Sequence, residues 1–405
     1  MTSNPTDAPA PPLVNWDRLD LHLAAAGVDA LLVGTPQSVT YLSDHWNLSQ
    51  WSRPAAQVFA LAVRGPDRHV ELVLGAGGTD LVGAGGTAAP THVRVAGRFV
   101  CDRADGPLDA EATRFADLLA GADGTGLHDQ LVAAVAASGA TRVAVEPRGL
   151  TAAQHAALAA ALPSVELVDG ERVLAGIRAV KSTREIHLLA ESARATERAI
   201  AQAFGGFERG NTERDVVRAF LAALPAPDAV PLFHVLTSGP RTAMPNGQAS
   251  DRVPADGDLL RFDGGCRFGH YTSDIARMAV LGGPSPKQED YYAAVVVGLE
   301  AATAVAGPGV PASACFDAAV RAVRRNGIPH YRRHHCGHGI GIDNYDLPAV
   351  TPDSTDVLEA GMVICLETPY YELGWGGVQA EDTMVITADG VERFTHQPAE
   401  LTVLR

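Results

Sequence analysis

Apolar positions predict alternating helices and strands in the first half of the chain. Leu19, Leu23 and Ala26 share one face of a helix over 16–26, which Gly27 ends. Short apolar runs predict strands over 28–33, 58–63, 69–74, 143–146 and 165–168, and an Ala-rich run predicts a helix over 152–162. This alternation indicates an α/β domain over 14–170. Residues 75–128 are Gly-rich and aperiodic, and they yield no prediction.

The second half opens with a capping box, in which Ser182 offers a side-chain oxygen and Glu185 follows three residues later. We therefore expect a linker over 171–182 and a second domain over 183–405. Helices are predicted after Ser182, from Ser285-Pro286 and over 312–325. Strands are predicted over 258–263, 271–281, 362–367 and 378–387, with a Gly-Gly turn between the first two. Antiparallel hairpins with helices between them make the predicted fold class of this half α+β.

Composition narrows the class of protein. The chain has 405 residues and a net charge of −15, which argues against nucleic acid or an anionic membrane as the main partner. Its 46% hydrophobic and 20% charged residues are typical of a globular protein, although the Pro-rich residues 1–13 indicate a disordered tail. The five cysteines are widely spaced and form no C-x-x-C. With no signal peptide or long apolar run, we expect a soluble cytoplasmic protein.

Two acidic residues end or follow predicted strands. Asp263 closes the run LLRFD, and Asp274 lies 11 residues later in HYTSDIAR. A tight hairpin between them would bring both carboxylates to one face, where they repel each other unless a cation lies between them. Each aspartate taken alone is more often a residue that forms a turn.

A dense histidine loop and two glutamates complete the candidate site. The loop HHCGHGIG spans 334–341, where glycines let the backbone approach closely, although a solvated loop or a polar network is an alternative. Glu367 and Glu381 lie in apolar strands, where a buried carboxylate is paired or binds a metal. Two Asp, one His and two Glu suit Mn²⁺, Fe²⁺, Co²⁺ or Zn²⁺ in a two-metal site.

The order of these motifs resembles the pita-bread metallopeptidases, the family of aminopeptidase P, prolidase and creatinase. The matching segments are FDGGCRFGHYTSDIAR, HHCGHGIGID, LEAGMVICLETPYY and GGVQAEDTMVIT, and in the N-terminal half DALLVGTPQSVTYLSD and VLAGIRAVKSTREIHLLAESA. The resemblance covers about residues 14–400. It implies a creatinase-like α/β domain followed by a curved antiparallel sheet with flanking helices.

The resemblance also implies a role for each ligand. Asp263 would hold one metal, His338 and Glu367 the other, and Asp274 and Glu381 would bridge the two ions. Mn²⁺ is the expected metal, with Co²⁺, Fe²⁺ or Zn²⁺ as alternatives. A hydroxide between the ions would attack an amide carbonyl of a short peptide, and Glu367 would move the proton. The family further implies a homodimer.

Three positions depart from the peptidase pattern. Asn246 and Tyr345 stand where the peptidases have histidines, and Gln379 stands where they often have arginine. Asn and Tyr donate hydrogen bonds but do not titrate near neutrality, so we expect weaker acid–base help, unless His334 or His335 supplies it. The catalytic candidates are therefore Glu367, His334, Asn246 and Tyr345.

The departures leave three functions open. The first is an Xaa-Pro aminopeptidase or dipeptidase that acts on short peptides. The second is a creatinase-like or other small-molecule hydrolase or lyase on the same scaffold, which the missing histidines favour. The third is a non-catalytic binding module, against which the five intact ligand residues argue. The basic residues Arg324, Arg325, Arg332 and Arg333 suit a solvated face, a subunit contact or recognition of a substrate carboxylate.

Overall fold

The computed structural model describes residues 11–52, 57–83, 91–225 and 228–405. The contacts divide the chain into two compact units, Met1–Arg178 and Ala179–Arg405. The division falls within the segment for which the sequence predicts a linker, and much of that segment is helix α7 (Glu171–Ala179). Most of the predicted N-terminal tail, residues 1–10, lies outside the described residues.

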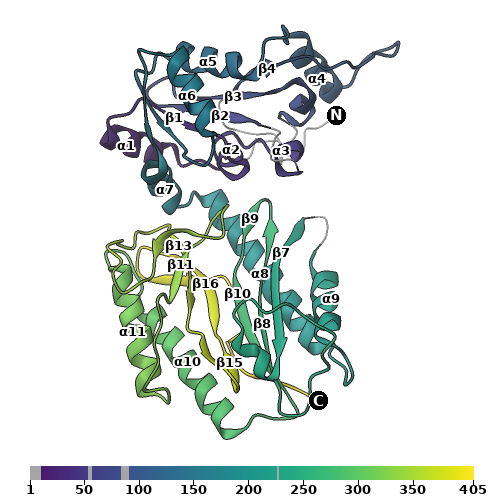
Figure 1. Cartoon of the computed structure of the whole chain (residues 1–405), viewed down its shortest axis with the longest axis vertical. Helices are drawn as coiled ribbons and strands as arrows, with labels where there is room; N and C mark the ends of the chain where they lie inside the picture. Colours follow the sequence, from purple (N-terminus) through teal and green to yellow (C-terminus); the bar gives the residue numbers. More distant parts are fainter. Residues whose placement is uncertain (1–10, 53–56, 84–90, 226–227) are drawn as a thin grey trace, which may run out of the picture. The chain divides into compact units, whose positions relative to one another are not determined.

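The first unit is built on a six-stranded mixed sheet in the order β4-β3-β2-β1-β5-β6 (Figure 1). Its strands are β1 (Ala30–Val33), β2 (Phe59–Val63), β3 (His69–Gly75), β4 (Thr91–Ala96), β5 (Arg142–Val145) and β6 (Glu166–Asp169). Its other helices are α1 (Trp16–Ala26), α2 (Pro36–Ser43), α3 (Leu48–Ser52), α4 (Ala110–Ala120), α5 (Leu127–Ala137) and α6 (Ala152–Ala161), with a 3₁₀ turn over Ala76–Leu81. The predicted α/β class is confirmed.

Local signals explain where these helices begin and end. Asn15 caps the first helix by accepting from the Arg18 amide, and Gly27 ends it at φ 64°, in the left-handed region that favours glycine. Thr151 and Gln154 form a reciprocal capping box at the start of α6. The segment 75–128, for which the sequence yields no prediction, contains β4, α4 and the start of α5, while its residues 84–90 lie outside the description.

The second unit is a ten-stranded sheet whose main path runs β12-β11-β13-β16-β10-β8-β7, with a separate β14–β15 hairpin. The strands are β7 (Ala229–Ser238), β8 (Leu259–Phe268), β9 (Tyr271–Thr272), β10 (Ile275–Leu281), β11 (Gly337–Gly339), β12 (Asp346–Ala349), β13 (Val363–Glu367), β14 (Tyr370–Glu372), β15 (Gly376–Val378), β16 (Glu381–Ile386), β17 (Val391–Arg393) and β18 (Thr402–Leu404). All pairings are antiparallel except β10 with β18, so the predicted antiparallel sheet is confirmed.

Four long helices flank this sheet: α8 (Thr183–Gly205), α9 (Glu213–Ala223), α10 (Pro286–Val305) and α11 (Ala312–Arg325). Helices α8 and α9 lie beside β7 and β8, and α10 lies beside α11, β13 and β15 (Figure 1). The predicted capping box at Ser182 and the cap at Ser285 are both present. Leu189, Ala193 and Ile200 face the core along α8, as the helical spacing predicts.

The predicted Gly-Gly turn is wrong. Gly264 and Gly265 lie inside β8, and the chain turns at Gly269 and His270, both at positive φ. Gly265 is required for a different reason, since a Cβ there would lie 1.9 Å from the Ser273 carbonyl oxygen of the neighbouring segment. The predicted strand over 378–387 is likewise two strands, β15 and β16.

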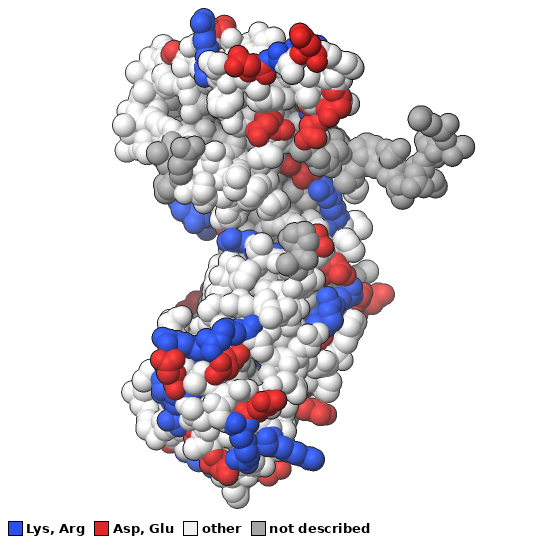
Figure 2. Space-filling model, turned by 90° about the vertical axis from the view of Figure 1, so that its right-hand side faces the viewer, with Lys and Arg blue, Asp and Glu red and all other residues white. Residues whose placement is uncertain are grey.

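The described residues also show how charge is distributed and whether a helix could cross a membrane. On the face shown in Figure 2, basic side chains lie among acidic ones in both units, and no extended basic patch is visible there. No helix within the described ranges is long and apolar enough to cross a membrane.

Candidate metal centre

Three carboxylates meet at the centre of the sheet in the second unit. The strand register explains the meeting, because Ala276 on β10 pairs with Asp263 on β8 and with Glu381 on β16. Asp274 immediately precedes β10, two residues before Ala276. Its side chain therefore lies on the same face of the sheet as those of Asp263 and Glu381. One oxygen from each of the three carboxylates lies within 4.8 Å of the others.

The remaining predicted ligands come from the next two strands. His338 on β11 lies with its Nε2 3.7 Å from the Asp274 carboxylate, and its Nδ1 lies 3.0 Å from the Gly339 carbonyl oxygen. Glu367 ends β13 directly opposite Glu381. Five strands or strand ends therefore bring together the side chains that the sequence places far apart.

The carboxylates of this cluster are buried close together, which makes their charged forms unfavourable. Burial, with repulsion from Asp263 and Glu367, raises the pKa of Asp274 well above its usual value. Burial, with repulsion from Asp274 and Glu367, does the same to the pKa of Glu381, and the pKa of Asp263 is also raised. These acids lack enough internal positive charge, and a divalent cation would supply it. The donor set of four carboxylates and one imidazole fits such ions.

Glu367 differs from the other acids because it has an internal partner. His335 Nε2 lies 2.6 Å from Glu367 Oε1. Although burial alone would raise the pKa of Glu367, the hydrogen bond and charge of His335 lower it overall. His334, the sequence candidate, is exposed and stacks edge-on against His335 at 4.2 Å between ring centroids. The structure thus places His335, rather than His334, against the acid.

The other two catalytic candidates lie in different surroundings. Tyr345 stacks on His338, with ring centroids 3.9 Å apart, and is 64% exposed. Its neighbour Asn344, which the sequence analysis missed, donates to Asp274 Oδ2 at 3.0 Å. Asn246 is exposed, and its backbone oxygen accepts from Gln248 Nε2 at 3.5 Å. The structure therefore brings Tyr345 to the cluster and leaves the Asn246 side chain without a contact to the acids.

A buried arginine stands close to the position where the family has one. Gln379 donates to Asp263 Oδ2 and to Glu381 Oε2, both at 3.1 Å, and its own oxygen accepts from Arg261 at 2.7 Å. The Arg261 guanidinium is fully buried and also lies 3.3 Å from Asp263 Oδ2. It further donates to the carbonyls of Met244 and Pro245. The positive charge absent at 379 is thus supplied from β8, two residues before Asp263.

Cys365 is a further neighbour that sequence reasoning did not single out. Its sulfur lies in a group with His338 and Glu381 whose ligand atoms are within 4.8 Å of one another. Burial and the nearby acids raise the pKa of the thiol well above its usual value. Its sulfur also lies 3.2 Å from the Thr383 hydroxyl oxygen, so the thiol is held between β13 and β16.

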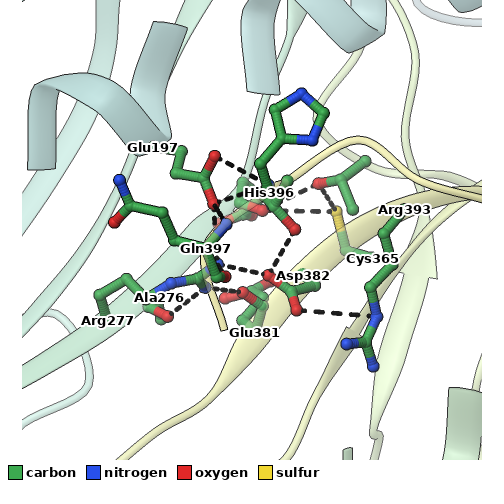
Figure 3. Close-up of polar contacts among 12 residues, drawn as sticks. Glu197, Ala276, Arg277, Cys365, Glu381, Asp382, Arg393, His396 and Gln397 are labelled. Atoms are coloured by element: carbon green, nitrogen blue, oxygen red, sulfur yellow. Dashed lines mark hydrogen bonds and ion pairs between the residues drawn. The ribbon is translucent and has the colours of Figure 1, made fainter. Parts of the chain in front are cut away.

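A second group of buried charges lies on the same strands (Figure 3). Arg277, in the motif DIAR, donates to Asp382 Oδ1 at 2.7 Å and to the Glu381 carbonyl oxygen at 2.8 Å. Its guanidinium also lies 3.4 Å from Glu197 on α8. Glu381 and Asp382 are adjacent, so they point to opposite faces of β16. Arg277 therefore fixes the strand that presents Glu381.

A small basic cavity of 260 Å³ adjoins the cluster. It is lined by His330, Arg332, Arg333, Pro369, Tyr370 and Tyr371. Tyr371 connects it to the acids, because its hydroxyl bonds Gln379 at 3.3 Å. The Nε of Arg333 is buried and has no acceptor within the described part of the chain, and its guanidinium lies over the Tyr371 ring. The site thus presents a cationic pocket beside an anionic cluster.

Comparison with known proteins places this arrangement in a family. The model of metallopeptidase family M24 matches residues 187–388, and that of the creatinase/prolidase N-terminal domain matches residues 78–180. The chain is 32% identical over 231 residues to an Xaa-Pro dipeptidase of Pyrococcus furiosus, a match that spans 56% of this chain and 66%, about two thirds, of that protein. It is 32% identical to an Xaa-Pro dipeptidase of Lactobacillus delbrueckii subsp. lactis, over 64% of this chain and 72% of that protein.

Solved structures agree with the sequence matches. The crystal structure of a prolidase from Pyrococcus horikoshii OT3 superposes with a TM-score of 0.75 at 25% identity, over 95% of this chain and 99% of that chain. The expected two-domain architecture, with a pita-bread second domain, is therefore confirmed. By its two matching family models, its dipeptidase relatives and this shared fold, the chain belongs to metallopeptidase family M24.

Proposed function

We propose that this protein is a dinuclear-metal dipeptidase that hydrolyses Xaa-Pro dipeptides. The observation that carries the proposal is the convergence of Asp263, Asp274 and Glu381, whose pKa values are raised because they are buried together. His338 and Glu367 would complete the ligand set and hold the ions together with Asp263, Asp274 and Glu381. Bound divalent ions would polarise the substrate carbonyl and activate a water molecule. The named dipeptidase relatives support the reaction and do not favour a creatinase-like activity.

The residues around the acids would perform the proton transfers. Glu367 stays ionised because of His335, so its carboxylate is able to take up a proton during attack on the carbonyl. Of the histidines in the loop 334–338, His335 has the imidazole closest to the Glu367 carboxylate, which its Nε2 contacts directly. It would supply the proton transfer that Asn246 and Tyr345 do not. Tyr345 keeps its phenolic proton, because partial burial of its ring against His338 and the charges of the nearby acids raise its pKa, and it would donate a hydrogen bond.

The basic cavity would select dipeptides. Arg333 has a buried Nε without an acceptor, and a substrate carboxylate is the acceptor that an arginine binds best. In a dipeptide that carboxylate follows the scissile bond by one residue, so it fits a pocket of 260 Å³ beside the cluster. A longer peptide would place an uncharged amide there instead.

The test compares three substrates with the Mn²⁺-loaded enzyme: an Xaa-Pro dipeptide, its C-terminal amide and an Xaa-Pro-Yaa tripeptide. The dipeptide should be hydrolysed with the highest kcat/KM. Arg333→Ala should raise KM for the dipeptide by roughly 10–100-fold and leave the amide nearly unchanged. Arg321→Ala, an exposed arginine on α11, is the matched control. Equal rates on the dipeptide and its amide would exclude the pocket's assigned role, and no hydrolysis of any of the three would exclude the proposed function.

The finer features implied by the resemblance belong to the same proposal. We take Mn²⁺ as the native metal, a homodimer as the assembly and the cytoplasm as the location. Metal analysis of the protein purified without chelator tests the choice of Mn²⁺. Light scattering, which gives the mass in solution, tests the homodimer. The proposal of Mn²⁺ fails if another metal purifies with the protein and supports higher turnover.

A further inference from the structure

A second group of metal-type ligands lies in the first unit, outside the acid cluster. Glu71 on β3 and His92 on β4 are directly paired across the sheet, and His69 lies two residues before Glu71 on the same face. One ligand atom from each of the three lies within 4.8 Å of the others. The two imidazoles stack with centroids 4.7 Å apart at 23°.

The separations suit an ion better than direct bonds. His69 Nε2 lies 3.7 Å and His92 Nδ1 lies 3.5 Å from the same oxygen, Glu71 Oε1. Both separations are long for a hydrogen bond. Ligand atoms bound tetrahedrally at about 2.0–2.2 Å from one metal ion lie roughly 3.4 Å apart. The three side chains therefore surround a space of the size that such an ion requires.

The neighbouring contacts orient the ligands in the way that metal sites do. His69 Nδ1 lies 2.9 Å from the Asp67 carbonyl oxygen, so Nδ1 carries the proton and Nε2 presents its lone pair toward Glu71. Arg94 donates to the other oxygen, Glu71 Oε2, at 2.7 Å, and reaches Oε1 only at 3.5 Å. Glu71 already has its charge balanced by Arg94, so neutralisation alone does not account for two further imidazoles at Oε1.

We propose that His69, Glu71 and His92 bind a divalent transition-metal ion such as Zn²⁺, separately from the M24 centre. Two imidazoles and a carboxylate are a ligand set that suits Zn²⁺, Ni²⁺ and Cu²⁺. The His92 side chain is 65% exposed and Glu71 is 5% exposed, so an ion enters from the solvent at His92 and meets a fixed carboxylate. The positive charge of Arg94 repels the ion, so the site binds more weakly than the acid cluster does.

The test counts Zn²⁺ bound per chain by equilibrium dialysis and elemental analysis of the chelator-treated protein. His92→Ala should bind one ion fewer than the wild type. His155→Ala, which removes an exposed histidine on α6, is the matched control and should bind as many ions as the wild type. The same comparison in an Asp274→Asn background should again show a loss of one ion, because the two sites are independent.

Far-UV circular dichroism and melting of the metal-free variants check that they fold. His69→Gln provides a second test, and it should lose the same ion as His92→Ala. As a spectroscopic measure, Zn²⁺ should shift the ring signals of His69 and His92 together in a histidine-selective NMR spectrum. Equal stoichiometry in the wild type and both variants, or unshifted rings, would overturn the proposed site while leaving the dipeptidase proposal intact.

Discussion

Two groups of buried acids occupy the strands of the second unit, and they are balanced in opposite ways. Asp382 meets Arg277 at 2.7 Å and Arg393 at 3.9 Å, so its countercharge is part of the fold. Glu381, the preceding residue, faces Asp263 and Asp274 and is left with raised pKa. A buried charge with an internal partner stabilises one packing, whereas a buried charge without one requires a cation from outside. The contrast separates the scaffold from the reactive centre.

The largest expected effect comes from changing the unbalanced group. Asp274→Asn should lose two-metal occupancy and reduce kcat/KM on an Xaa-Pro dipeptide by roughly 10³-fold, a loss comparable to that of a key electrostatic group. The metal-free variant should nevertheless unfold at a higher temperature than the metal-free wild type, because one repelling carboxylate is gone. Elemental analysis and thermal melting measure the two effects. Full two-metal occupancy in the variant would contradict the ligand assignment.

The balanced group should respond in the opposite way. Asp382→Asn leaves the buried Arg277 with backbone carbonyls and, among the described residues, with the more distant Glu197 as its only carboxylate partner, so the free energy of unfolding should fall by about 3 kcal/mol. The number of metal ions bound should not change. Urea unfolding of the metal-free protein measures the first quantity, and dialysis measures the second. A variant that keeps its stability and loses metal would reverse the roles assigned to the two groups.

Glu185 lies between the two groups, because it is buried and has internal partners but still keeps a raised pKa. Burial raises its pKa from 4.5 to about 7, although the Ser182 amide and Lys181 act in the opposite direction. Because the folded state holds this proton up to about pH 7 and the unfolded chain releases it near 4.5, stability should fall as pH rises between these values. Glu185→Gln should therefore gain about 3 kcal/mol over the wild type at pH 8 and little at pH 4. Urea unfolding of the metal-free proteins at both pH values measures this difference in stability. An equal gain in the free energy of unfolding at both pH values would refute the raised pKa of Glu185.

The smallest effect concerns Arg261, the one arginine that contacts the unbalanced group directly among the described residues. Arg261→Gln should weaken metal binding by roughly 10–100-fold, as loss of a group that orients a ligand does. Adding Gln379→Arg should restore part of the affinity by returning the guanidinium from β16's side of the cluster. Calorimetric titration with Mn²⁺ measures both. No recovery in the double variant would show that Arg261 acts through the Met244 and Pro245 carbonyls instead.

The sequence predicts the elements of this fold well where a local signal defines them. The helix over 16–26 and the cap at Ser182 follow from side chains that act within one turn. The predicted Gly264-Gly265 turn is wrong because Gly265 is required by the close approach of the Ser273 carbonyl on the neighbouring segment, a contact that no local pattern contains. Helix α9 lies outside the predicted elements although its sequence carries a helical signal, since Thr212 and Asp215 form a capping box and Val216 and Phe220 lie on its buried face. Strand β7 also lies outside them, because its buried positions do not alternate along the strand.

The candidate site shows the same division. The residue types of the five metal ligands can be read from their motifs. The order of those motifs along the chain is what resembles the family. Arg261 was missed because it replaces a charge expected at Gln379, which lies far along the chain and meets it only through strand pairing. The choice between His334 and His335 depends on which imidazole the loop turns inward, and adjacent identical side chains carry no signal of that.

The register that joins Ala276 to both Asp263 and Glu381 means that the centre is complete only after strands made at different times in synthesis have paired. A growing chain presents Asp263 and Asp274 first, then His338 and Glu367, and Glu381 last of the five. Strand β16 then inserts between β13 and β10, which closes a long loop and is a slow kind of folding event. Metal ions are therefore expected to bind a nearly finished sheet rather than to nucleate its folding.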